Sequence, residues 1–159
     1  MRFALALTIS LFASAVQAGD PMVDFGSDDP VMNAAIAEAR DSLPYFLDVA
    51  ASADLSQGGF LVKQAVDVGG ENYEHIWVMV ESIQAETLDG YYANEPNGFD
   101  AQAGDPVTVA MDEISDWSFY DADGLMKGNY TTRVMLPELD AETAAQVEAM
   151  LSPCPVESC

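Results

Sequence analysis

The sequence predicts an α+β domain: an N-terminal helix packed on a twisted or partly closed antiparallel sheet of about five strands, followed by a C-terminal helix. Three observations lead to this fold class. The chain has 159 residues, of which half are hydrophobic, enough for one domain with a core. Apolar residues recur first at helical spacing, then at strand spacing between turn residues, and finally at helical spacing again. We find no internal repeat.

The first eighteen residues have the anatomy of a secretory signal peptide. Met1 and Arg2 form a short basic start, residues 3–13 are almost wholly apolar, and small residues lead up to Ala18. The apolar run is too short for an ordinary transmembrane helix. We therefore expect cleavage after Ala18, a periplasmic or secreted location, and no membrane insertion after cleavage.

Residues 19–29 form an acidic leader, which we expect to be flexible, and residues 30–151 form the single domain. Asp29 is placed to cap a helix with Pro30 at its first position. Apolar residues then recur every three or four positions, at Met32, Ala35, Ile36, Ala39, Leu43 and Phe46. Pro44 is expected to kink or restart this helix, which runs to about Ala51.

Five strands are expected next, over residues 60–66, 73–83, 88–93, 107–111 and 114–120. The second has apolar residues on both faces, which predicts a central strand covered on both sides. Asp89 and Gly90 predict a turn at the start of the third strand, and residues 121–124 predict a hairpin tip. Residues 130–136 fit either a paired strand or a helix. Asp140 is placed to cap a final helix that ends at Leu151.

The charge balance excludes several classes of function. The chain has 27 acidic and 5 basic residues, a formal net charge of −22, and removal of Arg2 with the signal peptide leaves 4 − 27 = −23. Nucleic-acid binding and anionic membrane surfaces both require clustered Lys and Arg. Adaptation to a salty medium explains such a surface without a ligand. The sequence does not fix the oligomeric state.

We expect no cofactor and no metal site. The chain has a single His and two Cys, too few for a zinc site or a His-dependent triad, and it lacks phosphate-loop and dinucleotide fingerprints. The run from Asp121 to Gly124 lacks a third oxygen ligand and the bidentate Glu of a calcium loop. Cys154 and Cys159, in the tail over residues 152–159, are expected to form a structural disulfide.

Several short blocks, in this order and spacing, resemble the YegJ-like family of bacterial domains of unknown function. The resemblance covers residues 29–135 and implies a fold family, with no activity or catalytic residue to transfer. The blocks are Ala35-Ile36, Ala39-Arg40 with Phe46, Phe60-Leu61-Val62-Lys63, Glu74-His75-Ile76-Trp77, Gly90 with Asn94-Glu95-Pro96, Gly104-Asp105-Pro106-Val107, Ile114-Ser115-Asp116-Trp117, and Gly128-Asn129-Tyr130-Thr131-Thr132-Arg133.

His75 is the natural general acid or base at neutral pH, and Asp116 or Glu95 would be its partner in a small acid–base enzyme of hydrolase type. Glu74 is its neighbour in sequence but points to the other face of a strand. The structural alternative is a His buried beside Trp77 and satisfied by one carboxylate or carbonyl. The sequence offers no nucleophile motif.

Binding candidates come from the aromatic and basic residues. Trp77, Trp117 and Tyr92 would line a groove for a peptide or an apolar ligand, or else pack in the core. Lys63 and Arg133 would bind an anionic ligand, or else pair, like Arg40, with surplus carboxylates. Fold-determining residues outnumber catalytic ones, so we expect a non-enzymatic module that binds an unidentified protein or peptide, with the acid–base enzyme as the alternative.

Overall fold

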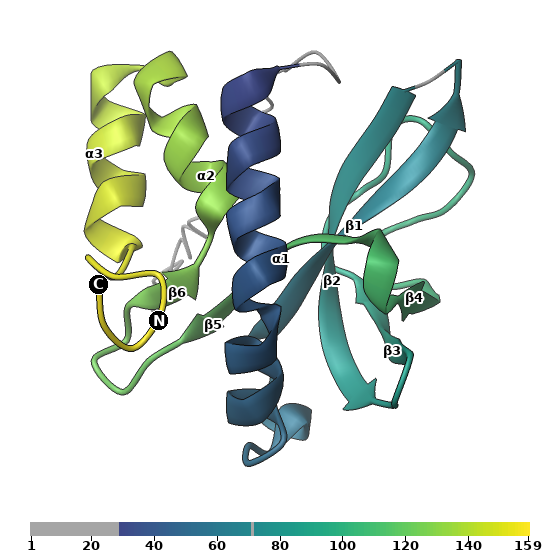
Figure 1. Cartoon of the computed structure of the whole chain (residues 1–159). Helices are drawn as coiled ribbons and strands as arrows, with labels where there is room; N and C mark the ends of the chain where they lie inside the picture. The colour runs from purple at the N-terminus through teal and green to yellow at the C-terminus, as the bar shows by residue number, and fades with distance from the viewer. Residues whose placement is uncertain (1–28, 71) are drawn as a thin grey trace, which may run out of the picture.

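One six-stranded antiparallel sheet, in the order β4-β3-β2-β1-β5-β6, forms the centre of the molecule (Figure 1). The computed structural model describes residues 29–70 and 72–159. Helix α1 crosses one face of the sheet, and α2 and α3 lie beside the β6 end. The helices are α1 (Pro30–Ala50), α2 (Tyr130–Met135) and α3 (Ala141–Met150), with single 3₁₀ turns at Leu55–Gln57, Met111–Glu113 and Leu136–Glu138. The strands are β1 (Phe60–Gly69), β2 (Asn72–Ile83), β3 (Thr87–Tyr92), β4 (Pro106–Ala110), β5 (Ile114–Tyr120) and β6 (Met126–Gly128).

The predicted α+β class is confirmed, and the sheet is open rather than partly closed. Helix α1 begins as expected, because an oxygen of Asp29 accepts hydrogen bonds from the backbone of Val31 and Met32 at 2.9 Å. The helix continues through Pro44 without restarting. Leu43 and Phe46 on either side of the proline are buried against the sheet, and this packing holds the helix together across the lost backbone hydrogen bond.

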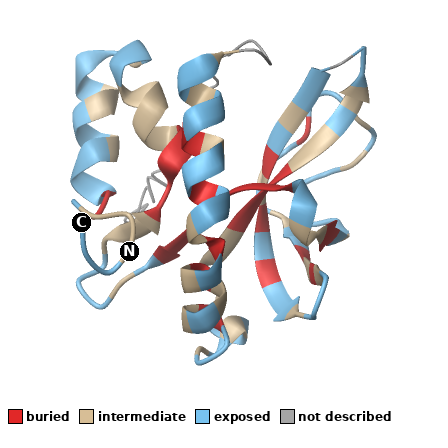
Figure 2. Ribbon diagram, in the orientation of Figure 1, coloured by how far each residue is buried: buried red, intermediate tan, exposed pale blue. Residues whose placement is uncertain are grey.

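The core lies between α1 and one face of the sheet. Trp117 of β5 is fully buried, and its indole nitrogen donates to the carbonyl of Ala39 at 3.0 Å. Its ring lies 5.7 Å from that of Phe46 on the same helix. Figure 2 shows β5 buried over almost its whole length where α1 crosses it. Burial of large aromatic side chains of this kind is the main source of stability in a small sheet domain.

Strand β2 is central, as predicted, because it pairs with β1 on one side and β3 on the other. The expectation that both its faces are covered is wrong. Ile76, Val78 and Val80 are buried toward α1, whereas on the opposite face Met79 is 41 % exposed and His75 is also exposed. Apolar residues on both faces of a strand are compatible with cover on both sides, but the sequence does not indicate whether a second layer is present.

Asp89 and Gly90 lie inside β3 and do not form the predicted turn. The chain reverses at residues 84–86, closed by a hydrogen bond from the Gln84 backbone to Thr87. The β2–β3 register shifts between Val80 and Ser82, and a Cβ at Gly90 would stand 2.1 Å from the carbonyl oxygen of Met79. Gly90 therefore permits close approach of two strands beside a bulge, a role that an Asp-Gly pair in sequence does not distinguish from a turn.

The chain after β5 follows the predicted hairpin but adds a sixth strand. Residues 121–124 turn as expected, with the Gly124 backbone donating to Asp121 at 3.0 Å. The three residues of β6 are too few to give a strand pattern in the sequence. Of the two alternatives for residues 130–136, the helix is the one formed. Asp140 caps α3 as predicted, accepting from the backbone of Glu142 and Thr143.

Both edges of the sheet are protected from pairing with another strand. The C-terminal tail covers β6, with backbone hydrogen bonds from Ser152 to Met126 and from Gly128 to Pro155. The predicted Cys154–Cys159 disulfide is present in this tail. At the other edge, β4 begins with Pro106, which has no N–H, and the Ala110 N–H donates to the Glu113 side chain at 3.2 Å.

The predicted signal peptide, its cleavage after Ala18 and nearly all of the acidic leader lie outside the described residues. Within residues 29–70 and 72–159, no helix combines the length and the apolar character needed to cross a bilayer.

Candidate functional site

Strands β1, β2 and β5 gather a polar cluster on the sheet face opposite α1. The strand registers place Lys63 beside Asp116 on one side and beside Trp77 on the other. Lys63 is only 7 % exposed. Its ammonium donates to the hydroxyl of Thr131 at 2.7 Å and lies 4.4 Å from the centre of the Trp77 ring. The cation is thus stabilised by a hydroxyl and an aromatic face.

Asp116 is fully buried and holds the start of α2. One carboxylate oxygen accepts from the backbone of Trp117 at 2.8 Å and of Tyr130 at 3.1 Å. The other accepts from the backbone of Thr131 at 2.8 Å and from its hydroxyl at 2.6 Å. Asn129, the N-terminal flanking residue of α2, is in the left-handed region and makes no side-chain cap. Asp116 supplies that cap from a distant strand, and its oxygens are occupied by this structural role.

His75 lies beside this cluster and is bonded to Ser115, which nothing in the sequence marks as a partner for the ring. Its Nδ1 is 2.8 Å from the hydroxyl oxygen of Ser115, which donates in turn to the carbonyl of Lys63 at 3.1 Å. Because the single hydroxyl hydrogen is used there, we assign the ring hydrogen to Nδ1, which leaves Nε2 as an acceptor. Burial of the ring against the sheet, and then the charges of Lys63 and Arg40, lower its pKa to about 4, although the residue keeps exposed surface.

The Ser115–His75 pair resembles part of a nucleophilic dyad, but Ser115 has no exposed surface. It lies at the irregularity where the β1–β5 register shifts between Lys63 and Gln64. No pattern in the sequence marks that shift. A substrate has no access to this hydroxyl.

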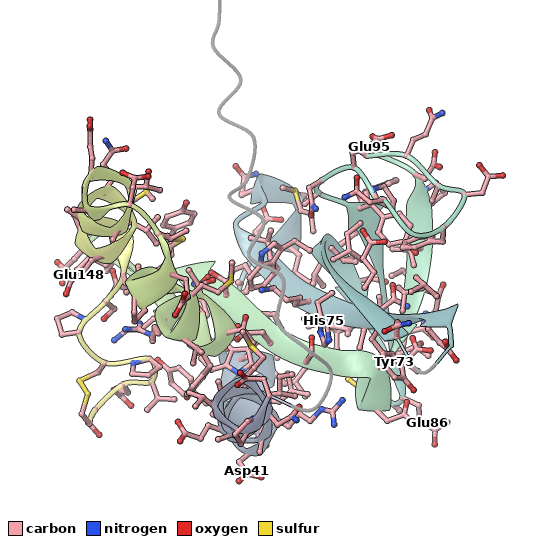
Figure 3. The ribbon with its side chains drawn as sticks, turned by 90° about the horizontal axis from the view of Figure 1, so that it is seen from above. Asp41, Tyr73, His75, Glu86, Glu95 and Glu148 are labelled. Atoms are coloured by element: carbon pink, nitrogen blue, oxygen red, sulfur yellow. A yellow bond between two sulfur atoms is a disulfide. The ribbon has the colours of Figure 1, made fainter. Side chains whose placement is uncertain are left out.

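The structure does not bring the predicted acid–base partners to His75. The hydrogen bond that its ring makes goes to Ser115, while Asp116 caps α2. Glu95 accepts from the Ala103 backbone at 3.0 Å in the loop after β3. Figure 3 shows Glu95 well apart from His75.

The arginines bind backbone carbonyls, contrary to the expectation that they pair with carboxylates. Arg133 donates to Gly128 at 3.1 Å and to Ser152 at 2.8 Å, which ties α2 to the tail. Arg40 donates to Ile114 at 2.8 Å and to Asp112 at 3.2 Å. Arg133 thus joins α2 to the end of β6 and to the tail, and Arg40 joins α1 to the start of β5 and to the 3₁₀ turn before it.

The three aromatic candidates do not line one groove. Trp117 and Tyr92 lie on the α1 side of the sheet, where Tyr92 packs against Phe99 at a ring separation of 5.5 Å. Trp77 lies on the opposite face, over Lys63. The predicted aromatic groove is therefore divided between the two faces of the sheet.

The face opposite α1 carries a strip of accessible apolar side chains, here called the open-face strip: Leu61, Tyr73, Trp77, Met79 and Tyr91. Tyr73 is 55 % exposed, Met79 41 % and its cross-strand partner Tyr91 39 %, while Leu61 and Trp77 are half-buried. Figure 3 shows Tyr73 and His75 following one another along β2. A row of this kind on one sheet face is available to a partner.

Two acidic residues, Glu81 and Asp89, lie at the Tyr91 end of the open-face strip. They border a depression of about 300 Å³, lined also by Pro106 and Thr108. Asp89 accepts from the side chains of Thr108, Gln84 and Ser82, and these bonds lower its pKa. A hydrogen bond to Glu81 raises the pKa of Tyr91. Within the described residues, no group of three or more His, Cys, Asp or Glu is arranged to hold a metal ion.

Comparison with known proteins gives one family match. The family model described as an uncharacterized protein conserved in bacteria (DUF2314) matches residues 29–151. No curated protein and no solved structure matches the chain.

Proposed function

This chain belongs to the DUF2314 family of uncharacterised proteins conserved in bacteria, and on that premise we propose that it is an exported, non-enzymatic module that binds another protein or peptide through the open-face strip. We also propose the finer assignment of this domain as YegJ-like. It is supported by the sequence blocks that contribute Lys63, Trp77, Asp116 and Thr131 to one cluster.

The observation that carries the proposal is the exposed cross-strand pair Met79 and Tyr91 on the sheet face opposite α1. Two large apolar side chains side by side, flanked by half-buried Leu61 and Trp77, lose unfavourable contact with water when a partner covers them, and this loss favours binding. The two sheet edges have fewer free backbone groups for a partner strand. The tail covers β6, while on β4 Pro106 has no N–H and the Ala110 N–H is bonded to Glu113. The sheet face opposite α1 is therefore better supported as a docking surface than either sheet edge.

The polar groups that an enzyme would need are occupied by structural contacts. Asp116 caps α2, the Ser115 hydroxyl donates to a backbone carbonyl, and Arg133 holds the tail. His75 is left without an acidic partner for proton transfer at its ring. This arrangement supports a binding role over acid–base chemistry.

Export is supported by the sequence of residues 1–18 and is compatible with the Cys154–Cys159 disulfide. A partner would then be another protein of the periplasm or of the cell exterior.

The test is capture of a partner from a periplasmic extract of the native bacterium. The bait is the wild-type protein, Met79→Asp or Met150→Asp. The two methionines have similar exposure, 41 % and 45 %, but Met150 lies on α3, away from the strip. Both substitutions add one negative charge, so a difference in prey capture between the two variants shows that the position of the charge matters.

We expect a prey protein that wild type and Met150→Asp capture equally and that Met79→Asp fails to retain. The prey, once purified, should bind the purified wild type with the same dependence. Equal capture by all three baits, or no specific prey, would overturn the proposal.

A further inference from the structure

We infer that the partner is an extended basic segment in which a Lys or Arg lies two residues from an apolar side chain, the apolar group packing on Met79 and Tyr91 and the cation lying against Glu81 and Asp89. This inference rests on the proposed function and names the partner class for the same surface.

The first support is the carboxylate of Asp89, whose hydrogen-bond donors within the described residues are all neutral. Asp89 accepts hydrogen bonds from three side chains, those of Thr108 at 2.7 Å, Gln84 at 2.8 Å and Ser82 at 3.2 Å. All three donors are neutral, so they fix the carboxylate in place and favour its ionised form without cancelling its charge. Glu81 lies on the same side, hydrogen-bonded to the neutral phenol of Tyr91. A cation at this end of the strip would meet two oriented carboxylates.

The second support is the spacing between the apolar and acidic parts. Met79 pairs with Tyr91, and two residues further along the strands lie Glu81, in the bulge of β2, and Asp89 of β3, which pairs with Ser82. Alternate residues of an extended chain are about 7 Å apart. An extended segment laid along this face therefore places side chains i and i+2 over the apolar pair and the acidic pair.

The third support is the uneven distribution of charge along the strip. Lys63 and Arg40 both act on His75, at the far end from Glu81 and Asp89. The chain as a whole has a formal net charge of −22, which disfavours acidic partners at long range. Local and overall charge thus favour the same basic partner, with its cation at the Tyr91 end.

The test uses three synthetic nine-residue peptides, each with one central Leu in a Gly/Ser background. Lys, Ser or Glu occupies the positions two residues before and after the Leu. Each is titrated into the isotopically labelled protein in 0.15 M NaCl, and amide shifts are followed by NMR. We expect the Lys peptide to bind at least ten-fold more tightly than the Ser peptide, the Glu peptide not to bind, and the shifts to concentrate in β2 and β3.

Three variants separate local recognition from overall charge. Glu81→Lys should weaken binding of the Lys peptide at least ten-fold, whereas Glu148→Lys, the same charge change on α3, should change it less than two-fold. Glu81→Gln removes the charge but keeps a hydrogen-bonding group for Tyr91, and it should weaken binding about three-fold or more. The backbone spectrum of each variant checks the fold.

Equal binding of the Lys and Ser peptides, equal weakening by Glu81→Lys and Glu148→Lys, or shifts centred elsewhere would overturn the inference. If this occurs while Met79→Asp still abolishes capture of the native prey, the proposed function stands with a different partner class. If Met79→Asp leaves capture unchanged, the proposed function itself fails.

Discussion

The hydroxyl of Thr131 donates to the buried carboxylate of Asp116 at 2.6 Å, and its oxygen accepts from the ammonium of Lys63 at 2.7 Å. One hydroxyl thus separates a buried cation from a buried anion. Because β1, β5 and α2 each contribute one of these groups, the contact joins the start of α2 to the centre of the sheet.

Replacing Thr131 with Val should destabilise the fold by about 2–3 kcal/mol, because two buried charged groups each lose a hydrogen bond. Thr131→Ser should restore most of the loss. Thr132→Val, on the half-buried next position of α2, is the matched control and should change stability by less than about 0.5 kcal/mol. Urea unfolding measures all three, and a neutral Thr131→Val would contradict this account of the cluster.

The ring of His75 should titrate far below neutrality, with a pKa near 4, because burial and the charges of Lys63 and Arg40 disfavour the protonated form. His75 is the sole His of the chain, so its Cε1 proton gives an isolated NMR signal. An ordinary pKa of about 6.5 would show that the ring is solvated and its bond to Ser115 is absent.

The lowered pKa of His75 makes the free energy of unfolding depend on pH. Since the folded pKa lies below the unfolded one, the unfolded chain binds the proton first, and stability falls as the pH drops from about 6.5 to about 4. The loss should be on the order of 1 kcal/mol, less than the full shift implies, because the side chain keeps solvent contact. His75→Gln should remove this component of the curve, and an unchanged curve would contradict the assignment.

Gly90→Ala should destabilise the protein by more than about 2 kcal/mol. A Cβ at this position would stand 2.1 Å from the Met79 carbonyl oxygen, so β3 must move away from β2. Amide exchange should rise along β3 and β4, whose pairing depends on this approach. A variant with wild-type stability would mean that the bulge is absent.

Removing the disulfide by Cys154→Ser with Cys159→Ser should lower stability by about 2 kcal/mol, the entropy of closing a short loop. Exchange should rise first at the Gly128 and Ser152 amides, which donate across the β6–tail contact. Protection of these amides equal to that of wild type would show that the tail holds without its crosslink.

The sequence predicts those parts of the fold that depend on local chemistry. Asp29 and Asp140 cap their helices as expected, because a cap needs only neighbouring backbone N–H groups. Strand β2 is recognisable from its alternating pattern. Asp89 and Gly90 fail as a turn because the reason for Gly90 lies on another strand, at Met79.

The candidate site was less predictable, since each of its contacts spans many residues. Asp116 caps a helix fourteen residues away, and Lys63 reaches Thr131 across 68 positions. Ser115 becomes the partner of His75 through a register shift that no local pattern encodes. Met79 is exposed because no second layer formed by residues 29–70 and 72–159 covers it, and an alternating strand pattern does not indicate whether such a layer is present.

The central claim is that the open-face strip at Met79 and Tyr91, and not the polar groups around His75, is the surface at which this protein acts. A photo-crosslinking amino acid placed at Met79, with the same group at Met150 as control, tests it most directly in living cells. We predict a discrete crosslinked product from position 79 that is absent from position 150. Products that are identical at both positions, or none at position 79, would contradict the claim.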